Sequence, residues 1–591
     1  MNKEEKDIIS IESDKAAGGA AHPHDAVQKK YRWKINDDHS PPQVYNWTLY
    51  LSVFVFGILG CARGYDDGCI AGNVTQTSFK ETFGLANKNL SSGALANLKS
   101  NITSMVQLGA IGGTIIAVYT VDKFGRIRAL QGVCVLWIVA AIIQITSHDV
   151  GQLYAGRFLE GLAIGQTTTI GPNYLSEVAP KAIRGLCGCI FAGAVYFGIM
   201  LGYFANYGTA IHIESGRNQW VYPTMVKIIL AGLIFVGSFV FCIESPRWFM
   251  RVGNPERAAE NLSKLRHLPV DHPYILGEIS DINEQIETEK REVEGTSIWA
   301  MVKEIVTVPS VRFRFFGLAV TSQLLGQWSG ANAITIYSPQ LFALAGVQGQ
   351  IPTLKMTAIL GVVKFISAYL SAFFLIDFLG RRRSLYCGIT LQMICILYFA
   401  LYLTIVPQAE DTGAVLTPSQ KAAGKAAMAA IFLSGTGWTF GFNAIQYLIG
   451  SEIFPLKVRS VAQSLTMLIH FVNIYANSKA LPSMLLAMDN YGAFYFFVGV
   501  MLIGLFWAYF FVPEISGRSL ESMEEIFSLP WYLIGRKGAE LCPDYSEVSK
   551  MQYTEDGSGN AHGGDIIYDD HHSKASAEYV EDLMEENHPN K

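Results

Sequence analysis

Long apolar stretches alternate with short polar segments between about residue 49 and residue 513. Each stretch is about as long as, or longer than, the roughly 20 helical residues that cross the hydrocarbon core of a bilayer. Only helices satisfy their own backbone hydrogen bonds in lipid, so each stretch is predicted to be a membrane-spanning helix. The twelve predicted spans are 49–71, 101–121, 129–147, 153–174, 186–207, 223–243, 314–345, 355–377, 384–406, 425–450, 460–484 and 491–513. The pattern therefore predicts an all-α polytopic protein that crosses the lipid bilayer twelve times.

Two charged patterns recur in the two halves of the chain. Asp-X-X-Gly-Arg follows the second span and again the eighth, and Glu-X-X-Pro-X-X-X-Arg follows the fourth span and again the tenth. The charged members are Asp122, Arg126, Glu177, Arg184, Asp377, Arg381, Glu452 and Arg459. Such a repeat predicts two pseudo-symmetric six-helix halves with a binding site at their interface near the bilayer midplane.

Polar segments set the remaining domain boundaries. The tail 1–45 and the acidic tail 514–591 are poor in apolar residues, so both are predicted to be disordered. The segment 247–312 is predicted to form short amphipathic helices, one of which begins with Asn254 as its N-cap and a proline at the next position. The two helical halves are then 46–246 and 313–513.

Basic residues predict the orientation of the chain. The short loops after the second, fourth, eighth and tenth spans carry Lys and Arg, and all four loops lie on one side of the membrane. The positive-inside rule places that side, the segment 247–312 and both termini in the cytoplasm, and we expect a plasma-membrane location. The first outer loop offers glycosylation sequons at Asn89 and at Asn73, whereas Asn101 lies very close to the membrane. The first forty residues lack the apolar core of a cleavable signal peptide, so the first span is expected to target the protein.

Composition excludes several classes of function. Charged residues make up only 16% of the chain, and the net charge is -5, so nothing indicates nucleic-acid binding. The nine cysteines include no Cys-X-X-Cys pair, which argues against a metal site. No nucleophile elbow or phosphate-binding loop is present, so we expect no enzyme and no cofactor.

Five motifs, in order, resemble those of the sugar porters of the major facilitator superfamily, specifically the fungal ones. They are Gly64–Gly68 (GYDDG), Gly156–Gly161 (GRFLEG), Pro172–Gly185, Glu244–Trp248 (ESPRW) and Pro513–Arg518 (PEISGR), the last differing at two positions from the PETKGR of the family. The resemblance covers about residues 45–525. It implies a monomeric transport unit that moves a monosaccharide, or a sugar acid such as quinate or a uronate, by alternating access.

The resemblance also assigns roles to charged residues. An acid at the position of Asp66 occurs in proton-coupled members and faces the arginine of the fourth span, here Arg157. We therefore expect proton symport, with Glu160 and Asp67 as further acids; a static ion pair in a facilitative uniporter is the alternative. The predicted gating charge network, which holds the outward-facing state, consists of the eight repeat residues above together with Glu244 and Arg247. The positive-inside rule accounts for the basic residues, but it does not explain why acidic residues recur at the same spacing in both halves.

Span 7 carries the predicted substrate contacts Gln323, Gln327, Asn332 and Tyr337. Amide side chains suit sugars because each offers donors and an acceptor to vicinal hydroxyl groups. The same polar stripe is also compatible with helix–helix packing.

Departures from the family pattern bear on the substrate. The expected amides of spans 5, 7 and 8 are replaced by Ala192, Gly326 and Lys364. Span 11 carries His470 and Asn473, and span 10 carries the aromatic Tyr447; these and Lys364 complete the predicted substrate site. A lysine in mid-membrane needs an anion. Two partners stay open: a carboxylate on a sugar-acid substrate, or an internal acid such as Glu160 with a neutral pentose or hexose as substrate.

A nutrient sensor that does not transport is the alternative from another class, since such sensors keep the fold and often carry long cytoplasmic tails. Retention of Asp66, Arg157, Gln327 and Asn332 favours transport.

Overall fold

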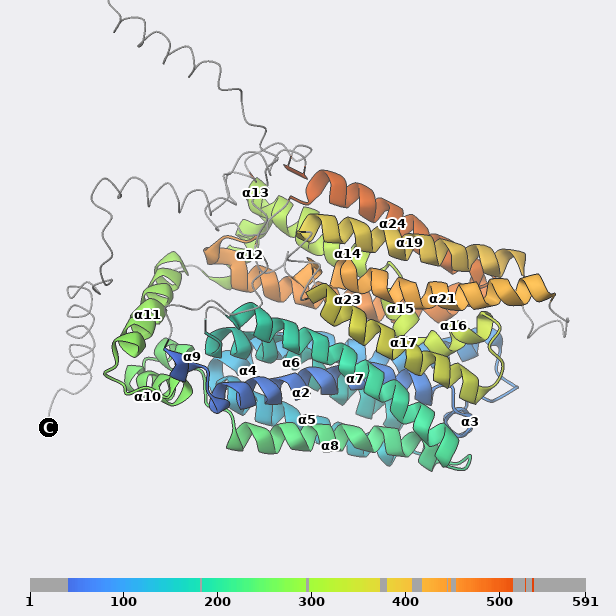
Figure 1. Cartoon of the computed structure of the whole chain (residues 1–591), viewed down its shortest axis with the longest axis horizontal. Helices are drawn as coiled ribbons and strands as arrows, with labels where there is room; N and C mark the ends of the chain where they lie inside the picture. The colour runs from blue at the N-terminus through green and yellow to red at the C-terminus, as the bar shows by residue number, and fades with distance from the viewer. Residues whose placement is uncertain are drawn as a thin grey trace, which may run out of the picture. The chain divides into compact units, whose positions relative to one another are not determined.

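The computed structural model describes residues 41–513 except 181–182, 294–296, 373–379, 407–416, 444 and 448–452, together with 527, 534 and 535. Long helices dominate this part of the chain (Figure 1). The first half consists of α2 (Trp47–Asn73), α4 (Ser92–Phe124), α5 (Arg126–Ile145), α6 (Val150–Val178), α7 (Arg184–His212) and α8 (Asn218–Val240), with the short α3 (Thr77–Thr82) after α2. Each of the first six predicted spans is thereby confirmed as one helix.

The segment between the halves forms helices, as predicted. These linker helices are α9 (Pro246–Arg251), α10 (Pro255–Arg266), α11 (Pro273–Val293), α12 (Ile298–Thr307) and α13 (Pro309–Arg312). The side chain of Asn254 accepts a hydrogen bond from the N–H of Arg257, which confirms it as the N-cap of α10. The helices α9 to α11 lie at one end of the helix bundle, called here the linker end, and α3 lies at the opposite, far end (Figure 1).

The second half departs from prediction in its first span. The sequence predicted one helix over 314–345, but the chain forms a π-helix, η3 (Phe313–Val320), followed by α14 (Thr321–Gln327), α15 (Ala331–Ile336) and α16 (Ser338–Leu344). Gly330, just before α15, has φ +85°, a left-handed conformation that residues with a Cβ rarely adopt, and it interrupts the helix. Non-helical backbone at membrane depth is tolerated where it is buried in protein or lines a cavity.

The rest of the second half follows the predicted order. It contains α17 (Gln350–Leu370), α19 (Arg381–Ile405), α21 (Pro418–Phe440), α23 (Leu456–Ala487) and α24 (Tyr491–Phe511). The two halves meet where α7 packs on α17 and α4 packs on α23. The interface between the repeats therefore pairs the fifth span with the eighth and the second span with the eleventh.

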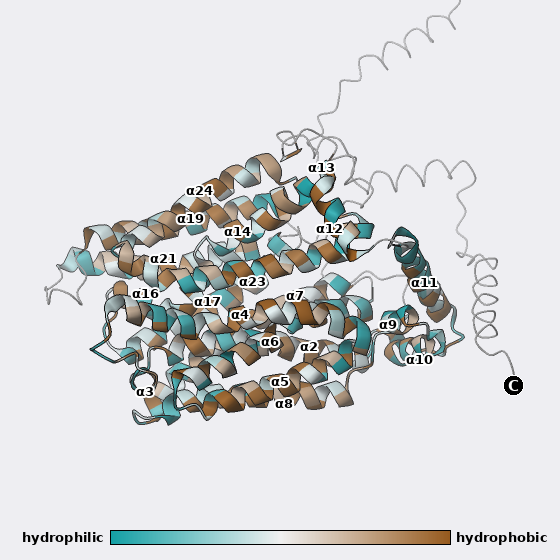
Figure 2. Ribbon diagram, turned by 180° about the vertical axis from the view of Figure 1, so that it is seen from behind, coloured by the Kyte–Doolittle hydropathy of each residue, from teal (hydrophilic) through white to brown (hydrophobic). Residues whose placement is uncertain are grey.

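Hydrophobic residues predominate along the long helices (Figure 2), and many large apolar side chains on them are exposed. On α8, for example, Ile229, Leu233 and Val236 are all more than half exposed. Within the described residues, eight helices are long and apolar enough to cross a membrane by length and composition. α6 and α23 are as long, but they carry charged or amide side chains at their centres. These polar positions belong to the site described next.

Candidate functional site

Four charged side chains from three helices meet inside the first half. Arg157 Nη1 lies 3.3 Å from Asp66 Oδ1, which confirms the predicted contact between these residues. Lys227 of α8, which the sequence analysis did not single out, lies 2.5 Å from the same Asp66 oxygen and 3.0 Å from Glu160 Oε2. All four side chains are at most 3% exposed. We call Asp66, Arg157, Glu160 and Lys227 the buried charge cluster.

Neutral donors complete the surroundings of Glu160. Trp137 Nε1 donates to Glu160 Oε1 at 3.0 Å, and Gln144 Nε2 donates to Oε2 at 2.7 Å. Glu160 is thus bound to Lys227 and not to Lys364, so the predicted alternative of a Lys364–Glu160 pair is wrong. Among the described residues, Asp66 Oδ2 and both Nε and Nη2 of Arg157 have no hydrogen-bond partner. The cluster holds two acids and two bases, and it still has unused donors and an acceptor.

A second polar cluster lies in the second half, beside the break in span 7. His470 Nδ1 lies 2.8 Å from Gln323 Oε1 and 3.3 Å from Gln327 Nε2. Tyr447 Oη lies 3.1 Å from His470 Nε2, and Gln327 Nε2 also donates to Gln446 Oε1 at 3.3 Å. The structure therefore brings four predicted substrate residues into one connected set, with Gln446 as an additional member.

The space for Gln446 comes from a glycine. A Cβ at Gly326 would lie 2.8 Å from Gln446 Oε1. Because the glutamine expected at position 326 is absent, an amide from span 10 occupies its place. The amide of Gln446 thus partly compensates for the glutamine missing at position 326. The sequence alone did not show this, because it depends on how spans 7 and 10 pack together.

The remaining predicted substrate residues lie apart from this set. Asn473 accepts a hydrogen bond from Trp328 Nε1 at 3.1 Å, and Asn332 donates to Ser478 Oγ at 3.0 Å. Tyr337 lies toward the far end and is 2% exposed, with its hydroxyl 2.7 Å from Thr103 Oγ1 of the first half. Tyr337 therefore joins the two halves in this conformation.

Lys364 is enclosed between helices. Its side chain is 1% exposed, and Nζ donates to Thr335 Oγ1 at 2.5 Å. A Cβ at Gly435 of α21 would lie 3.1 Å from the Lys364 methylenes. Lys364 contacts span 7, but its ammonium group is not among the groups that line the central cavity described below.

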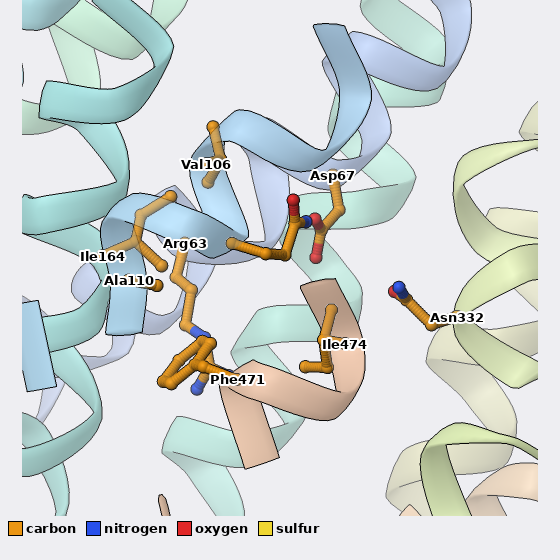
Figure 3. A pocket seen from close by; sticks show the side chains of 9 residues that line it. Arg63, Asp67, Val106, Ala110, Ile164, Asn332, Phe471 and Ile474 are labelled. Carbon is orange, nitrogen blue, oxygen red and sulfur yellow. The ribbon is translucent and has the colours of Figure 1, made fainter. Parts of the chain in front are cut away.

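A small cavity of about 40 Å³ lies between the halves (Figure 3). Its polar lining is Arg63 and Asp67 of α2, Gln107 of α4 and Asn332 of α15, and Phe471 of α23 closes one wall. Ligand pockets usually measure about 300 Å³ or more, so this cavity has to widen before a sugar-sized solute fits. Asp66 and Asp67 are adjacent in sequence, yet one faces the buried charge cluster and the other faces the cavity.

Hydrogen bonds join the two halves at the far end. Lys99 Nζ donates to Gln340 Oε1 at 2.5 Å, and Lys479 Nζ donates to Asn97 Oδ1 at 2.6 Å and also to Asn101 Oδ1. Asn73 lies near this end but is only 4% exposed, and its amide donates to Thr224. The predicted glycosylation at Asn73 is therefore wrong, because a buried amide leaves no room for a glycan; Asn89 is exposed.

At the linker end, part of the predicted gating network is visible. Arg126 pairs with Glu177 at 2.7 Å and with Asp122 at 3.8 Å. Glu244 accepts from the backbone N–H groups of Arg126 and Ile127 at 2.9 and 3.0 Å, so it caps the start of α5. Burial raises the pKa of the Glu244 carboxyl, and these N–H groups oppose the shift.

Other predicted members of the network have different surroundings. Arg247 pairs with Glu289 of α11 at 2.6 Å, and Arg459 donates to the Phe454 carbonyl. Arg184 is exposed at the start of α7, and Arg381 begins α19. Asp377 and Glu452 lie outside the described residues. The role of this network in holding one conformation stays a prediction.

Comparison with known proteins agrees with this architecture. The family model "Sugar (and other) transporter" matches residues 52–527. The chain is 33% identical over 500 residues to a "Probable quinate permease" of Aspergillus fumigatus, covering 83% of this chain and 90% of that protein. It is 34% identical over 499 residues to a "Quinate permease" of Neurospora africana, covering 83% and 91%.

Solved structures show the same fold. A partially occluded, inward-open conformation of the xylose transporter XylE from E. coli superposes with a TM-score of 0.65 at 21% identity, covering 80% of this chain and 100% of that one. XylE bound to 6-bromo-6-deoxy-D-glucose, described as a proton:xylose symporter, gives 0.64 at 23% identity. Two six-helix halves, the motif series and these matches agree: the chain is a membrane protein that belongs to the sugar (and other) transporter family.

Proposed function

We propose that this protein moves a polyhydroxylated solute of the sugar type, with a sugar acid such as quinate included, across the plasma membrane by alternating access. The observation that carries the proposal is the connected set of Gln323, Gln327, Gln446, Tyr447 and His470 beside a broken span. Amide, imidazole and phenol groups together offer donors and acceptors that match vicinal hydroxyls. The names of the quinate permeases, at about one-third identity, favour a carboxylated solute.

The alternating motion would break and remake contacts between the halves. The bonds of Lys99, Lys479 and Tyr337 close the far end here. With both termini and the linker helices in the cytoplasm, the far end is the outer face, and this conformation blocks entry from outside. Opening the far end would require these three side chains to release their partners.

Proton coupling is the second part of the proposal. When all four groups of the buried charge cluster are ionised, their charges cancel. One added proton leaves a net positive charge in a buried site, which is unfavourable in the membrane interior. Proton binding to Asp66 would therefore favour a conformation in which Arg157 or Lys227 moves away. A single chain forms the transport unit, and no bound cofactor takes part.

Uptake in a yeast that lacks its own carriers tests the function. Labelled quinate, galacturonate, xylose and glucose are supplied to cells with wild type or Gln327→Ala, with surface expression measured by an epitope tag. Uptake of at least one solute by wild type, reduced in the variant, supports the proposal. Surface expression with no uptake of any solute would favour the sensor alternative.

A further inference from the structure

We infer that Arg63 binds the carboxylate of an anionic solute in the central cavity, and that it thereby selects sugar acids over neutral sugars. The inference rests on the proposed function and deepens it. Arg63 lies near the middle of α2, and its side chain lines the cavity between the halves (Figure 3).

Arg63 forms no ion pair within the described residues, and the charge of Asp67, one helical turn away, acts on it only from beyond ion-pair distance. Within the part of the chain that the structure describes, its guanidinium makes no hydrogen bond and no ion pair; its contact is the Phe471 ring, whose centroid lies 5.9 Å away. Charged side chains at membrane depth are costly and are normally paired, or they mark the path of a substrate. An aromatic face gives only a weak substitute for a carboxylate.

Other basic side chains at this depth are already engaged. Arg157 and Lys227 pair with Asp66, and Lys227 also pairs with Glu160. Lys364, for which the sequence analysis left a carboxylate partner open, donates to Thr335 and is enclosed between helices. The guanidinium of Arg63 is the basic group that lines the cavity.

The cavity also has an opposite, hydroxyl-binding side. Asp67 lies one helical turn from Arg63 on α2, but the described structure contains no ion pair between them. In Figure 3 the Arg63 guanidinium is directed toward Phe471, whereas Asp67 and Asn332 point into the space on the other side. A sugar acid would place its carboxylate on Arg63 and its hydroxyls on Asp67, Asn332 and Gln107.

This arrangement explains why a neutral sugar should be a poorer substrate. A guanidinium offers a planar fork that matches a carboxylate with two charge-assisted hydrogen bonds. A neutral sugar in the same place leaves that fork without an anion. Sites built to bind a polar group reject analogues that lack it far more strongly than apolar pockets do.

The test compares galacturonate with galactose, which carries CH2OH in place of the carboxylate. Initial uptake rates are measured for wild type, Arg63→Gln and Arg63→Lys, each corrected for surface expression. We expect Arg63→Gln to lower the galacturonate-to-galactose ratio of kcat/KM by about 30-fold, the loss typical of charge-assisted hydrogen bonds. Arg63→Lys keeps the charge and should lower the ratio less.

A competition measurement on wild type alone tests the inference even if a variant fails to fold. Galacturonate should compete for transport about 30-fold better than its neutral methyl ester, by the same loss of a charge-assisted contact. An unchanged ratio in Arg63→Gln, equal competition by acid and ester, or a ratio that collapses in Lys364→Gln instead would each overturn the inference while transport itself stands. Absence of all uptake by surface-expressed wild type would instead overturn the proposed function.

Discussion

The Lys227 ammonium nitrogen lies 2.5 Å from Asp66 Oδ1, closer than the Arg157 guanidinium, whose nearest nitrogen is 3.3 Å away. The carboxylate expected to carry a proton thus has two cations beside it. A second acid, Glu160, contacts Lys227 and balances the charge. The unit to be tested is therefore a four-residue cluster and not an isolated Asp–Arg pair.

Removing the Lys227 charge should destabilise the folded protein. Lys227→Met leaves two buried acids to share one guanidinium, and breaking a buried pair by removing one partner costs about 3–5 kcal/mol. Adding Glu160→Gln removes the acid that lost its cation, so the double variant should recover much of that loss. Thermal unfolding in detergent measures both. A double variant as unstable as the sum of the two single variants would contradict the proposed balance of charges.

Neutralising Asp66 should separate binding from coupling. In Asp66→Asn we expect accumulation against a gradient to be lost, while exchange of labelled for unlabelled solute continues, because the side chain no longer changes protonation. Accumulation is measured with and without a protonophore in the same cells.

Asp67→Asn is the matched control for this experiment, since it makes the same change one position along α2, on the cavity side. Its uptake should be slower, because Asp67 is expected to contact the solute hydroxyls, but the accumulation that remains should still respond to the protonophore. If wild-type accumulation does not respond, the protein is a uniporter and the cluster is structural.

Glycine packing between α2 and α7 gives a prediction about stability. A Cβ at Gly64 would overlap the backbone of Val195, whereas a Cβ at Gly57, two turns earlier, would make an ordinary contact 3.8 Å from Ile190. Gly64→Ala should therefore force the helices apart and lower stability by about 1–3 kcal/mol. Gly57→Ala should have little effect on the melting temperature. Equal melting temperatures for the two variants would show that the interface between α2 and α7 can accommodate an added methyl group at Gly64.

Structural features that depend on patterns over many residues could be predicted from the sequence. Runs of apolar residues located the spans, and repeated motifs located the two halves. The Asp66–Arg157 contact was predicted from the resemblance to the sugar porters. Lys227 was not singled out, because one lysine in an apolar run does not reveal an acid 161 residues away. Its presence inside a predicted span was nevertheless a signal, since such a charge needs a partner.

Other features depend on packing that no local pattern specifies. The sequence predicted one continuous helix for span 7, because a glycine inside an apolar run does not by itself indicate a break, and only the backbone shows the left-handed conformation of Gly330. Gln446 could be recognised as a replacement for the amide missing at Gly326 only after spans 7 and 10 were placed together. Arg63 faces the cavity because of the rotation of α2, which the sequence of one helix does not determine.

The Glu244 cap should make stability depend on pH. Because burial raises the pKa of Glu244 in the folded protein, its contribution is fully present below the ordinary carboxyl pKa of about 4.3 and is lost as the pH rises through the folded pKa. Arg126 and the N–H groups of α5 oppose this shift but do not reverse it. Glu244→Gln cannot titrate. The melting temperature of wild type minus that of the variant should therefore be larger near pH 4 than near pH 7, and a constant difference would contradict the assignment.

Closure of the far end can be tested by a reversible cross-link. Lys479 Nζ of α23 donates to Asn97 Oδ1 of α4 at 2.6 Å, so cysteines at both positions should be joined by a short bifunctional thiol reagent. If the halves must separate here for the solute to pass, cross-linking Asn97→Cys with Lys479→Cys should abolish most uptake, and reduction should restore it. Either single variant, treated with the same reagent, reports reaction at other cysteines, including the exposed Cys387. Full uptake by a chain shown to be cross-linked would mean that the far end stays closed during transport, and the alternating-access motion proposed for these helices would be wrong.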